Sequence, residues 1–325
     1  MSKAGSILVE APARLHFGVL DLRGRLGRCF GGLGAAIPSP SLLIEVKPAT
    51  QIAAEGPDAD RAMEFANRWL AYHKIPGGAH LRIHRAIPSH SGLGSGTQLG
   101  LAVASALSEL HGLAADPLEL ARSVGRGKRS AIGTWTFALG GFIVEGGRKP
   151  GSERIAPLLA RFAIAPTWRC VVAVPHGGRG LSGEAEAEAF ERLPPPPDRE
   201  VERVAHLVLM QLLPALVEAD LPSFGDALSA VQRITGAWFA AQQGGIFAPG
   251  PTEQLIAELA RLGAVGVGQS SWGPAAYGIV DSDDAAAELA SQVSRLLGPG
   301  GEVFRGAFAA QGARIGASAD PPQSD

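Results

Sequence analysis

The chain has 325 residues, of which 46% are hydrophobic, and a length about twice that of a typical domain predicts two lobes with an ample buried core. Its formal net charge of −2, with both signs well mixed, excludes a general attraction to nucleic acid or to an anionic membrane. Two cysteines, Cys29 and Cys170, are too few for a disulfide framework, and no stretch approaches the roughly 20 apolar residues of a membrane span, so we expect a cytoplasmic protein.

Strand signals open the chain. The segments Ile7–Glu10 and Ser41–Val46 are apolar and β-branched, which predicts two antiparallel strands, with turns in the glycine-rich stretch Gly18–Gly34 between them. The spacing of apolar residues over Arg61–Tyr72 predicts an amphipathic helix. Polar and apolar residues then alternate over His80–Ile87, which predicts a half-buried strand.

A glycine loop follows that strand directly. Residues 88–98 read Pro-Ser-His-Ser-Gly-Leu-Gly-Ser-Gly-Thr-Gln, and the apolar spacing from Leu99 to Leu110 predicts a helix behind them. The free N–H groups at a helix N-terminus favour phosphate, but each charge gains only about 0.3–1 kcal/mol there, so basic side chains or a cation must help. The pattern is neither a P-loop nor a dinucleotide fingerprint. By itself it fits a tight structural turn as well as an anion site.

The middle of the chain contains the boundary between the lobes. Asp116 is placed to cap a helix that has Pro117 at its first position and ends near Gly125. Strands are predicted over Phe137–Glu145 and Trp168–Val174, and the proline run at 193–198 predicts a stiff, extended connector. We place the boundary between Gly147 and Asp198.

The last third of the chain is predicted to contain two long helices followed by alternating helices and strands. Helices are predicted over Glu200–Val217, with a kink at Pro214, and over Phe224–Ala241. A split βαβ-like arrangement follows, which comprises a helix at 252–262, strands at 264–267 and 275–280, a helix at 284–297 and a strand at 303–309.

The loop at 88–98 resembles the Pro-x-x-x-Gly-Leu-Gly-Ser motif of the GHMP-kinase superfamily. That resemblance implies an α+β fold of two lobes, a ribosomal-S5-like N-terminal lobe over residues 1–165 and a ferredoxin-like C-terminal lobe over residues 166–325. The Gly-Thr-Gln that ends the loop, together with the stretches 14–34, 125–147 and 269–278, is similar to the β-ribofuranosylaminobenzene 5′-phosphate synthases. This second resemblance spans nearly the whole chain.

The synthase resemblance implies a decarboxylating ribosyltransferase on the route to a methanopterin-type one-carbon carrier. Phosphoribosyl pyrophosphate would condense with 4-aminobenzoate or 4-hydroxybenzoate, with release of pyrophosphate and carbon dioxide. An ATP-dependent small-molecule kinase and a non-catalytic phospholigand sensor remain alternatives. The segment Arg126–Phe137 contains no carboxylate to assist an acceptor hydroxyl, which favours the synthase over the kinase. The resemblance also implies a homodimer.

The motifs supply the candidate site residues. The hypothesis assigns catalytic roles, through contacts with the benzoate carboxylate or a phosphate, to five residues: Arg14, His16, Arg28, Arg126 and Ser130. It assigns phosphate or substrate binding to Ser91, Gly92, Gly94, Ser95, Gly96, Thr97, Gln98, Lys128, Arg129, Thr134, Ser270, Ser271 and Trp272. Pyrophosphate chemistry also implies Mg²⁺, with Asp21 as its candidate ligand.

Several of these residues have simpler explanations. Taken alone, the basic run Arg126–Arg129 is more typical of a solvated helix end than of a binding site, and the resemblance reverses that preference. Trp272 and Tyr277 are interpreted either as stacking partners for the aromatic substrate or as core residues. Ser270 and Ser271 have no His and Asp at a recognisable spacing, which argues against a hydrolase nucleophile and leaves hydroxyl donors to phosphate.

Overall fold

The computed structural model describes residues 5–178, 180 and 183–317. Two strands much longer than the rest run through the first lobe, and their seven-stranded sheet has the order β11-β1-β2-β4-β3, with β5 between β2 and β6. The strands of this sheet are β1 Ile7–Asp21, β2 Phe30–Ala49, β3 Ala53–Glu55, β4 Gly78–Arg85, β5 Phe142–Glu145, β6 Leu158–Phe162 and β11 Arg314–Ala317.

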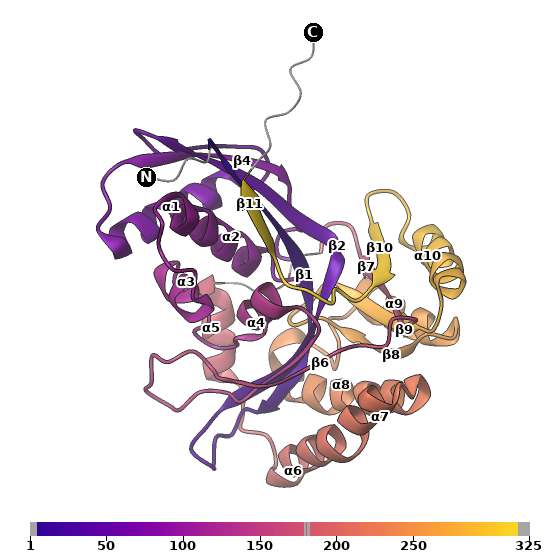
Figure 1. Cartoon of the computed structure of the whole chain (residues 1–325). Coiled ribbons are helices and arrows are strands. Elements are labelled where there is room, and N and C mark those ends of the chain that lie inside the picture. The colour runs from indigo at the N-terminus through magenta and orange to yellow at the C-terminus, as the bar shows by residue number, and fades with distance from the viewer. Residues whose placement is uncertain (1–4, 179, 181–182, 318–325) are drawn as a thin grey trace.

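Four helices cover one side of the first sheet, and they carry the glycine loop and the basic run (Figure 1). They are α1 Ala59–His73, α2 Ser95–Leu110, α3 Pro117–Ser123 and α4 Ile132–Leu139. Helix α2 is buried along most of its length because nearly all its residues are small or apolar. The predicted cap of α3 is confirmed, since the Asp116 carboxylate accepts the N–H groups of Leu118 and Glu119.

The second sheet has four antiparallel strands in the order β10-β7-β9-β8. They are β7 Arg169–Val174, β8 Val265–Gln269, β9 Ala276–Val280 and β10 Glu302–Ala307, with α9 Pro251–Arg261 and α10 Asp283–Leu297 packed on one face. In chain order this is the 4-1-3-2 arrangement of a ferredoxin-like lobe. The predicted α+β fold is therefore confirmed.

The region between β7 and β8 is helical. It contains α5 Gly183–Arg192, α6 Asp198–Leu207, a π-helical turn at Val208–Leu212, α7 Leu213–Glu218 and α8 Leu221–Gln243. The sequence predicts the irregularity near Pro214, and the structure shows it as the π turn just before that residue, which has no N–H for the helical ladder. Helix α8 packs against both β1 and β8, and so joins the lobes.

One hydrophobic core runs through both lobes. The ring of Phe17 on β1 stacks on Phe142 at 5.8 Å between centroids and lies 5.2 Å from Tyr277 on β9. Tyr277 is fully buried in this core, so its interpretation as a packing residue is the correct one. The chain leaves the first sheet after Phe162 and enters the second sheet at Arg169. Strand β11 belongs to the first sheet again, where it pairs with β1.

Two predictions about glycines and strands are wrong. The strand predicted over Phe137–Glu145 begins only at Phe142, because α4 continues to Leu139 and two glycines with positive φ turn the chain. The stretch Gly18–Gly34 is not mainly turns, because both long strands extend into it. Gly34 lies within β2, where any side chain would collide with Ile132 of α4 and the Leu15 carbonyl. This glycine allows close packing of a helix rather than a turn.

No helix in the described residues combines the length and the apolar character that crossing a membrane requires.

Candidate active site

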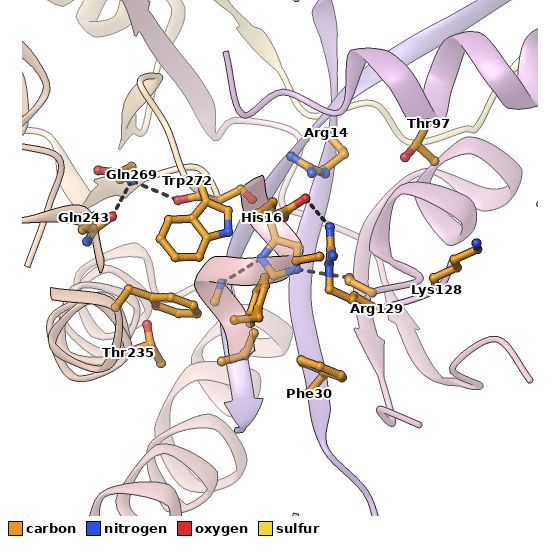
Figure 2. A pocket seen from close by; sticks show the side chains of 18 of the residues that line it. Arg14, His16, Phe30, Thr97, Lys128, Arg129, Thr235, Gln243, Gln269 and Trp272 are labelled. Atoms are coloured by element: carbon orange, nitrogen blue, oxygen red, sulfur yellow. Dashed lines mark hydrogen bonds and ion pairs between the residues drawn. The ribbon is translucent and has the colours of Figure 1, made fainter. Parts of the chain in front are cut away.

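A cavity of about 620 Å³ opens between the lobes. Its walls come from β1, the first turn of α2, the segment 125–130, α5, α8 and the loop 269–272. In Figure 2, Trp272, Gln243, Gln269 and Thr235 lie on one side of His16, and Thr97, Lys128 and Arg129 lie on the other. The cavity thus has an aromatic and amide-lined end and a cationic end.

The glycine loop packs directly onto a half-buried arginine, Arg14. Gly94 caps α2 with φ 83°, and a Cβ atom there would lie 2.9 Å from Cγ of Arg14. The Arg14 guanidinium donates to the Gly92 carbonyl, which also accepts the Ser270 hydroxyl at 2.8 Å. Burial lowers the pKa of Arg14 to about 10, so it stays cationic at neutral pH. Within the loop, Thr97 is the residue that reaches the cavity wall.

The basic run predicted from the sequence lies at the cationic end. The Arg126 guanidinium lies 4.9 Å from the centroid of the Phe65 ring, and a Cβ atom on Gly96 would come within 3.0 Å of its Nη2. Arg126 has no carboxylate partner in the described part of the chain, and its Nε is buried without an acceptor. Burial, followed by repulsion from Arg61 and Arg68, lowers its pKa to about 10. An unpaired, half-desolvated cation beside a helix N-terminus favours an anionic ligand.

Arg129 and Lys128 complete the cationic end in different ways. Arg129 forms an ion pair with Glu186 of α5, and its guanidinium lies 5.3 Å from the centroid of the Phe190 ring. Glu186 is the single acidic side chain that the described residues place at the cavity wall. The Lys128 ammonium group has no acidic partner among those residues, so positive charge exceeds negative charge at this end.

His16 lies between the two ends and is uncharged. Its Nε2 is 3.2 Å from the Ser130 hydroxyl, and Gly18 N–H donates to its Nδ1 at 3.4 Å. Burial, followed by the nearby Arg14 charge, lowers the pKa of His16 to about 3. The structure therefore gives His16 no positive charge with which to hold a carboxylate or phosphate.

The lowered pKa of His16 predicts acid sensitivity of the fold. Between the ordinary value of 6.5 and about 3, the unfolded chain binds a proton that the folded chain does not. The contribution to stability is therefore complete above the upper value and is lost as the pH falls through this window. Between pH 7 and pH 5 the loss is about 2 kcal/mol at 1.36 kcal/mol per pKa unit. Urea unfolding at both pH values should show a smaller loss in His16→Gln, and equal losses would contradict the prediction.

Three aromatic rings form the other end. Phe190 of α5, Phe239 of α8 and Trp272 meet edge to face, with centroids 4.9 to 5.7 Å apart. Phe30 of β2 extends the cluster at 5.7 Å from Phe190. The sequence prediction included Trp272 but missed the three phenylalanines: Phe190 and Phe239 lie outside the motif stretches, and Phe30 lies within the stretch 14–34 but was not singled out. An edge-to-face wall of this kind suits a planar aromatic ligand.

Several predicted residues support the cavity without lining it. Arg28 donates to the carbonyls of Gly146 and Gly147 at 2.8 and 3.0 Å, and Oδ1 of Asp21 accepts the N–H groups of Arg23 and Gly24. Four other predicted residues are buried around the glycine loop and do not reach the cavity: Ser91, Gln98, Thr134 and Ser270. Of the predicted residues, the cavity brings together Arg14, His16, Thr97, Arg126, Lys128, Arg129, Ser130, Ser271 and Trp272.

The donors at this site give little support to a protein-held metal ion. Mg²⁺ usually binds one or two carboxylates together with substrate phosphates. Here the wall offers Glu186, which is paired with Arg129, and no cluster of three acidic, histidine or cysteine side chains occurs within the described residues. The Asp21 carboxylate serves a turn, outside the cavity wall. Magnesium dependence stays a prediction, and no step is assigned to the ion.

Comparison with known proteins supports the fold. The family model for the GHMP kinases N terminal domain matches residues 60–141, and the model for the GHMP kinases C terminal domain matches residues 212–298. Among solved structures, a homoserine kinase from Cytophaga hutchinsonii aligns over 97% of this chain and 98% of its own, with a TM-score of 0.68 and 16% identity. A Streptococcus pneumoniae phosphomevalonate kinase aligns over 93% and 99%, with a TM-score of 0.66 and 14% identity. Identities this low show the fold alone.

Closer similarity is found among curated proteins. A protein of Methanothermobacter thermautotrophicus is 34% identical over 93% of this chain and 98% of its own length. A protein of Archaeoglobus fulgidus is 35% identical over 85% and 88%. Both are named beta-ribofuranosylphenol 5′-phosphate synthase.

Proposed function

This chain belongs to the β-ribofuranosylphenol 5′-phosphate synthase family within the GHMP-kinase superfamily, and we propose on this premise that it transfers a ribosyl 5-phosphate group to an aromatic acid. The observation that carries the proposal is the two-ended cavity. Unpaired cations beside a helix N-terminus suit a pyrophosphate, and the ring cluster suits a benzoate. Both substrates of the ribosyltransferase reaction thereby find complementary surfaces in one space.

The proposed reaction needs positioning and charge stabilisation more than a nucleophile. The bond between the ribose C1 and pyrophosphate breaks, and the leaving group keeps the electron pair. The acceptor ring then forms a carbon–carbon bond to C1 at the carbon that bears its carboxylate. Loss of carbon dioxide returns the electrons of the broken bond to the ring, so no oxidant or reductant is required. The residues must therefore hold the two reactants together and stabilise the departing negative charge.

We assign the leaving pyrophosphate to the cationic end. Arg126 and Lys128 lack acidic partners among the described residues, so neither must break an ion pair to bind it. Thr97 adds a hydroxyl from the first turn of α2, and the dipole of that helix favours the anion. Separate positions for the pyrophosphate and for the 5′-phosphate of the ribose within this end stay a prediction.

We assign the acceptor to the aromatic end and propose that it is the phenolic acid, 4-hydroxybenzoate. The support is the name of the relatives, beta-ribofuranosylphenol 5′-phosphate synthase, which describes a ribofuranosylphenol product. The sequence alone leaves 4-aminobenzoate as an equal alternative. Thr235, at this end of the cavity, donates its own hydroxyl hydrogen to the Val231 carbonyl. Its oxygen therefore remains an acceptor for either para group.

The kinase alternative receives less support. A kinase of this fold would use a carboxylate near the acceptor hydroxyl. In the described part of the cavity wall, the acidic side chain is that of Glu186, and it is already paired with Arg129. The fold alone does not separate the two activities, because the solved kinases share it.

The deciding experiment supplies purified protein with phosphoribosyl pyrophosphate and carboxyl-labelled acid, with and without Mg²⁺. Labelled carbon dioxide and pyrophosphate should appear in equal amounts, faster with 4-hydroxybenzoate than with 4-aminobenzoate. Turnover of ATP without release from either acid would overturn the proposal in favour of a kinase. Light scattering of the same sample tests the predicted homodimer.

A further inference from the structure

Two arginines of helix α1 that have no role in the reaction above lie beside the glycine loop. Arg61, Phe65 and Arg68 follow one another at intervals of four and three residues, so they share one face of this helix. The Phe65 ring is buried and lies 3.3 Å from the position that a Cβ atom on Gly100 of α2 would take. This face therefore brings both guanidinium groups to the side of α1 that meets α2.

The guanidinium group of Arg61 is held through one nitrogen, and its other amino nitrogen is available. Its Nη1 donates to the Ser89 hydroxyl oxygen at 2.8 Å and to both carboxylate oxygens of Asp58 at 3.3 Å. Ser89 in turn donates to Asp58 at 2.7 Å, which fixes the acid as well. No hydrogen bond within the described residues involves Nη2 of Arg61. This nitrogen lies over Gly96, in the first turn of α2, where a Cβ atom would collide with it.

A second guanidinium group approaches the same glycine. A Cβ atom on Gly96 would also lie 3.0 Å from Nη2 of Arg126. Gly96 has no positive φ, so its lack of a side chain serves this approach of two arginines and not the backbone conformation. Arg126 and Arg68 lie 4.9 and 6.0 Å from the centroid of the Phe65 ring. Three cations are thus gathered around one glycine and one aromatic ring.

The acidic side chains near this cluster do not balance its charge. Asp58 pairs with Arg61, whereas the ion pair of Arg68 with Glu64 spans 3.9 Å between side chains that are both more than half exposed, where solvent weakens it. Arg126 has no acidic partner in the described part of the chain. The positive end of the α2 dipole adds to the repulsion. Such a cluster is unfavourable in the free protein and becomes favourable once an anion lies between the cations.

This position differs from the one assigned to the pyrophosphate. Thr97 follows Gly96 directly, and neighbouring residues of a helix point about 100° apart. Thr97 lines the main part of the cavity, whereas Gly96 faces Arg61 of α1. The cavity wall also includes Arg126 and, beyond it, Arg68, so the two positions are connected.

We propose that a phosphate monoester binds beside Gly96 and is held by three arginines: Arg61, Arg68 and Arg126. In the ribosyltransferase reaction this group is the 5′-phosphate of the donor, and the pyrophosphate stays on the side of Thr97. The pyrophosphate leaves during the reaction but the 5′-phosphate remains on the product, so a separate position holds the sugar in place while the new bond forms. The assignment to the ribose rests on the proposed function, whereas the anion position does not.

Two fragments of the donor test this assignment. Isothermal titration calorimetry measures the Kd of ribose 5-phosphate and the Kd of inorganic pyrophosphate separately. In Arg61→Gln the Kd of ribose 5-phosphate should rise at least about 10-fold, the effect of losing one hydrogen bond to a charged group, and the Kd of pyrophosphate should rise much less. Equal rises for both fragments, or no rise for ribose 5-phosphate, would overturn the separate position.

Arg82→Gln is the matched control for the change in net charge. Arg82 lies on β4 of the same lobe and forms an ion pair with Glu55 at 3.2 Å, with both side chains more than half exposed. Its replacement removes the same charge without a contact to α2, so neither Kd should change. A rise in the Kd of ribose 5-phosphate as large as that in Arg61→Gln would show a general effect of charge and would overturn the proposal.

Gly96→Ala tests the same position without removing a charge. Alanine is the better helix former and no positive φ opposes it here, so Tm should stay unchanged or rise. The added methyl group must displace the guanidinium groups of Arg61 and Arg126, which are the ends of flexible side chains. Ribose 5-phosphate should therefore bind more weakly by a factor similar to that in Arg61→Gln. Undiminished binding would overturn the contact at Gly96.

Failure of the proposed reaction can be told apart from failure of this anion position. If the parent releases no carbon dioxide from either acid, inorganic phosphate, titrated in the presence of saturating pyrophosphate, still tests the position without sugar or turnover. A higher Kd of phosphate in Arg61→Gln but not in Arg82→Gln would support it, and an unchanged Kd would overturn it. If the parent is active, ribose 5-phosphate should compete with phosphoribosyl pyrophosphate, and Arg61→Gln should raise its inhibition constant while the KM for the aromatic acid stays unchanged.

Discussion

Replacing Arg126 with Gln should lower kcat/KM for phosphoribosyl pyrophosphate by roughly 10- to 100-fold, since a hydrogen bond to a charged group contributes about 1.5–3 kcal/mol. The same change should leave the free energy of unfolding unchanged or higher. Burial and the neighbouring Arg61 and Arg68 already disfavour this cation, and the described residues offer it no carboxylate. A side chain that is unfavourable in the free protein and favourable with an anion is typical of a binding site.

Arg122→Gln is the matched control for this prediction. Arg122 lies on α3, four residues earlier, and forms an exposed ion pair with Glu119 at 3.4 Å, so its loss should affect neither substrate. Steady-state kinetics and the shift of Tm with added pyrophosphate measure the two effects separately. If Arg126→Gln lost stability and kept its kcat/KM, Arg126 would be a structural residue and the cationic end would lose its assignment.

The sequence predicts the fold well where local signals and tertiary packing agree. The strand, glycine loop and helix unit around residues 80–110 is confirmed, as are the cap at Asp116 and the alternation of elements after residue 251. In each of these segments the residues that pack are also the residues with the right periodicity. The resemblance of the loop to the superfamily motif supplied the topology, which periodicity alone does not give.

The errors come from glycines whose role depends on distant residues. Gly34 is typical of a turn, yet it lies within β2, where Ile132, nearly a hundred positions later in the chain, packs in the space that a side chain would fill. The strand predicted from Phe137 begins late for a similar reason, since α4 must end over β2 before β5 can pair with it. No local pattern reports contacts across such separations.

The residues of the site also divide into those that a local sequence pattern predicts and those that only tertiary packing brings together. Charged motif residues such as Arg126 are recognisable because they occur in a run with glycines, and the structure places that run at the cavity. Phe190 and Phe239 belong to helices α5 and α8, and only the packing of both helices against Trp272 makes them a wall. Ser130 belongs to the stretch 125–147 that the sequence singles out, but its contact with His16 requires β1 and the segment before α4 to meet.

Trp272→Leu should raise KM for the aromatic acid by roughly 10-fold and leave KM for phosphoribosyl pyrophosphate unchanged. The indole meets the rings of Phe239 and Phe190 edge to face at 4.9 and 5.6 Å, and only 8% of the residue is exposed. A benzoate in this cluster would lose one aromatic partner, at about 0.5–1.5 kcal/mol beyond the buried area that a smaller side chain also forfeits. Phe239→Leu should produce the same selective change from the opposite element.

Trp135→Leu separates this effect from the loss of any tryptophan. Trp135 lies on α4, donates its indole N–H to the Ala156 carbonyl at 3.0 Å and is not part of the cavity wall, so its loss should affect stability alone. Initial rates with each substrate varied at saturation of the other give the two KM values. A rise in KM for phosphoribosyl pyrophosphate alone in Trp272→Leu would place the sugar, not the benzoate, at this end. The two substrate assignments would then have to be exchanged.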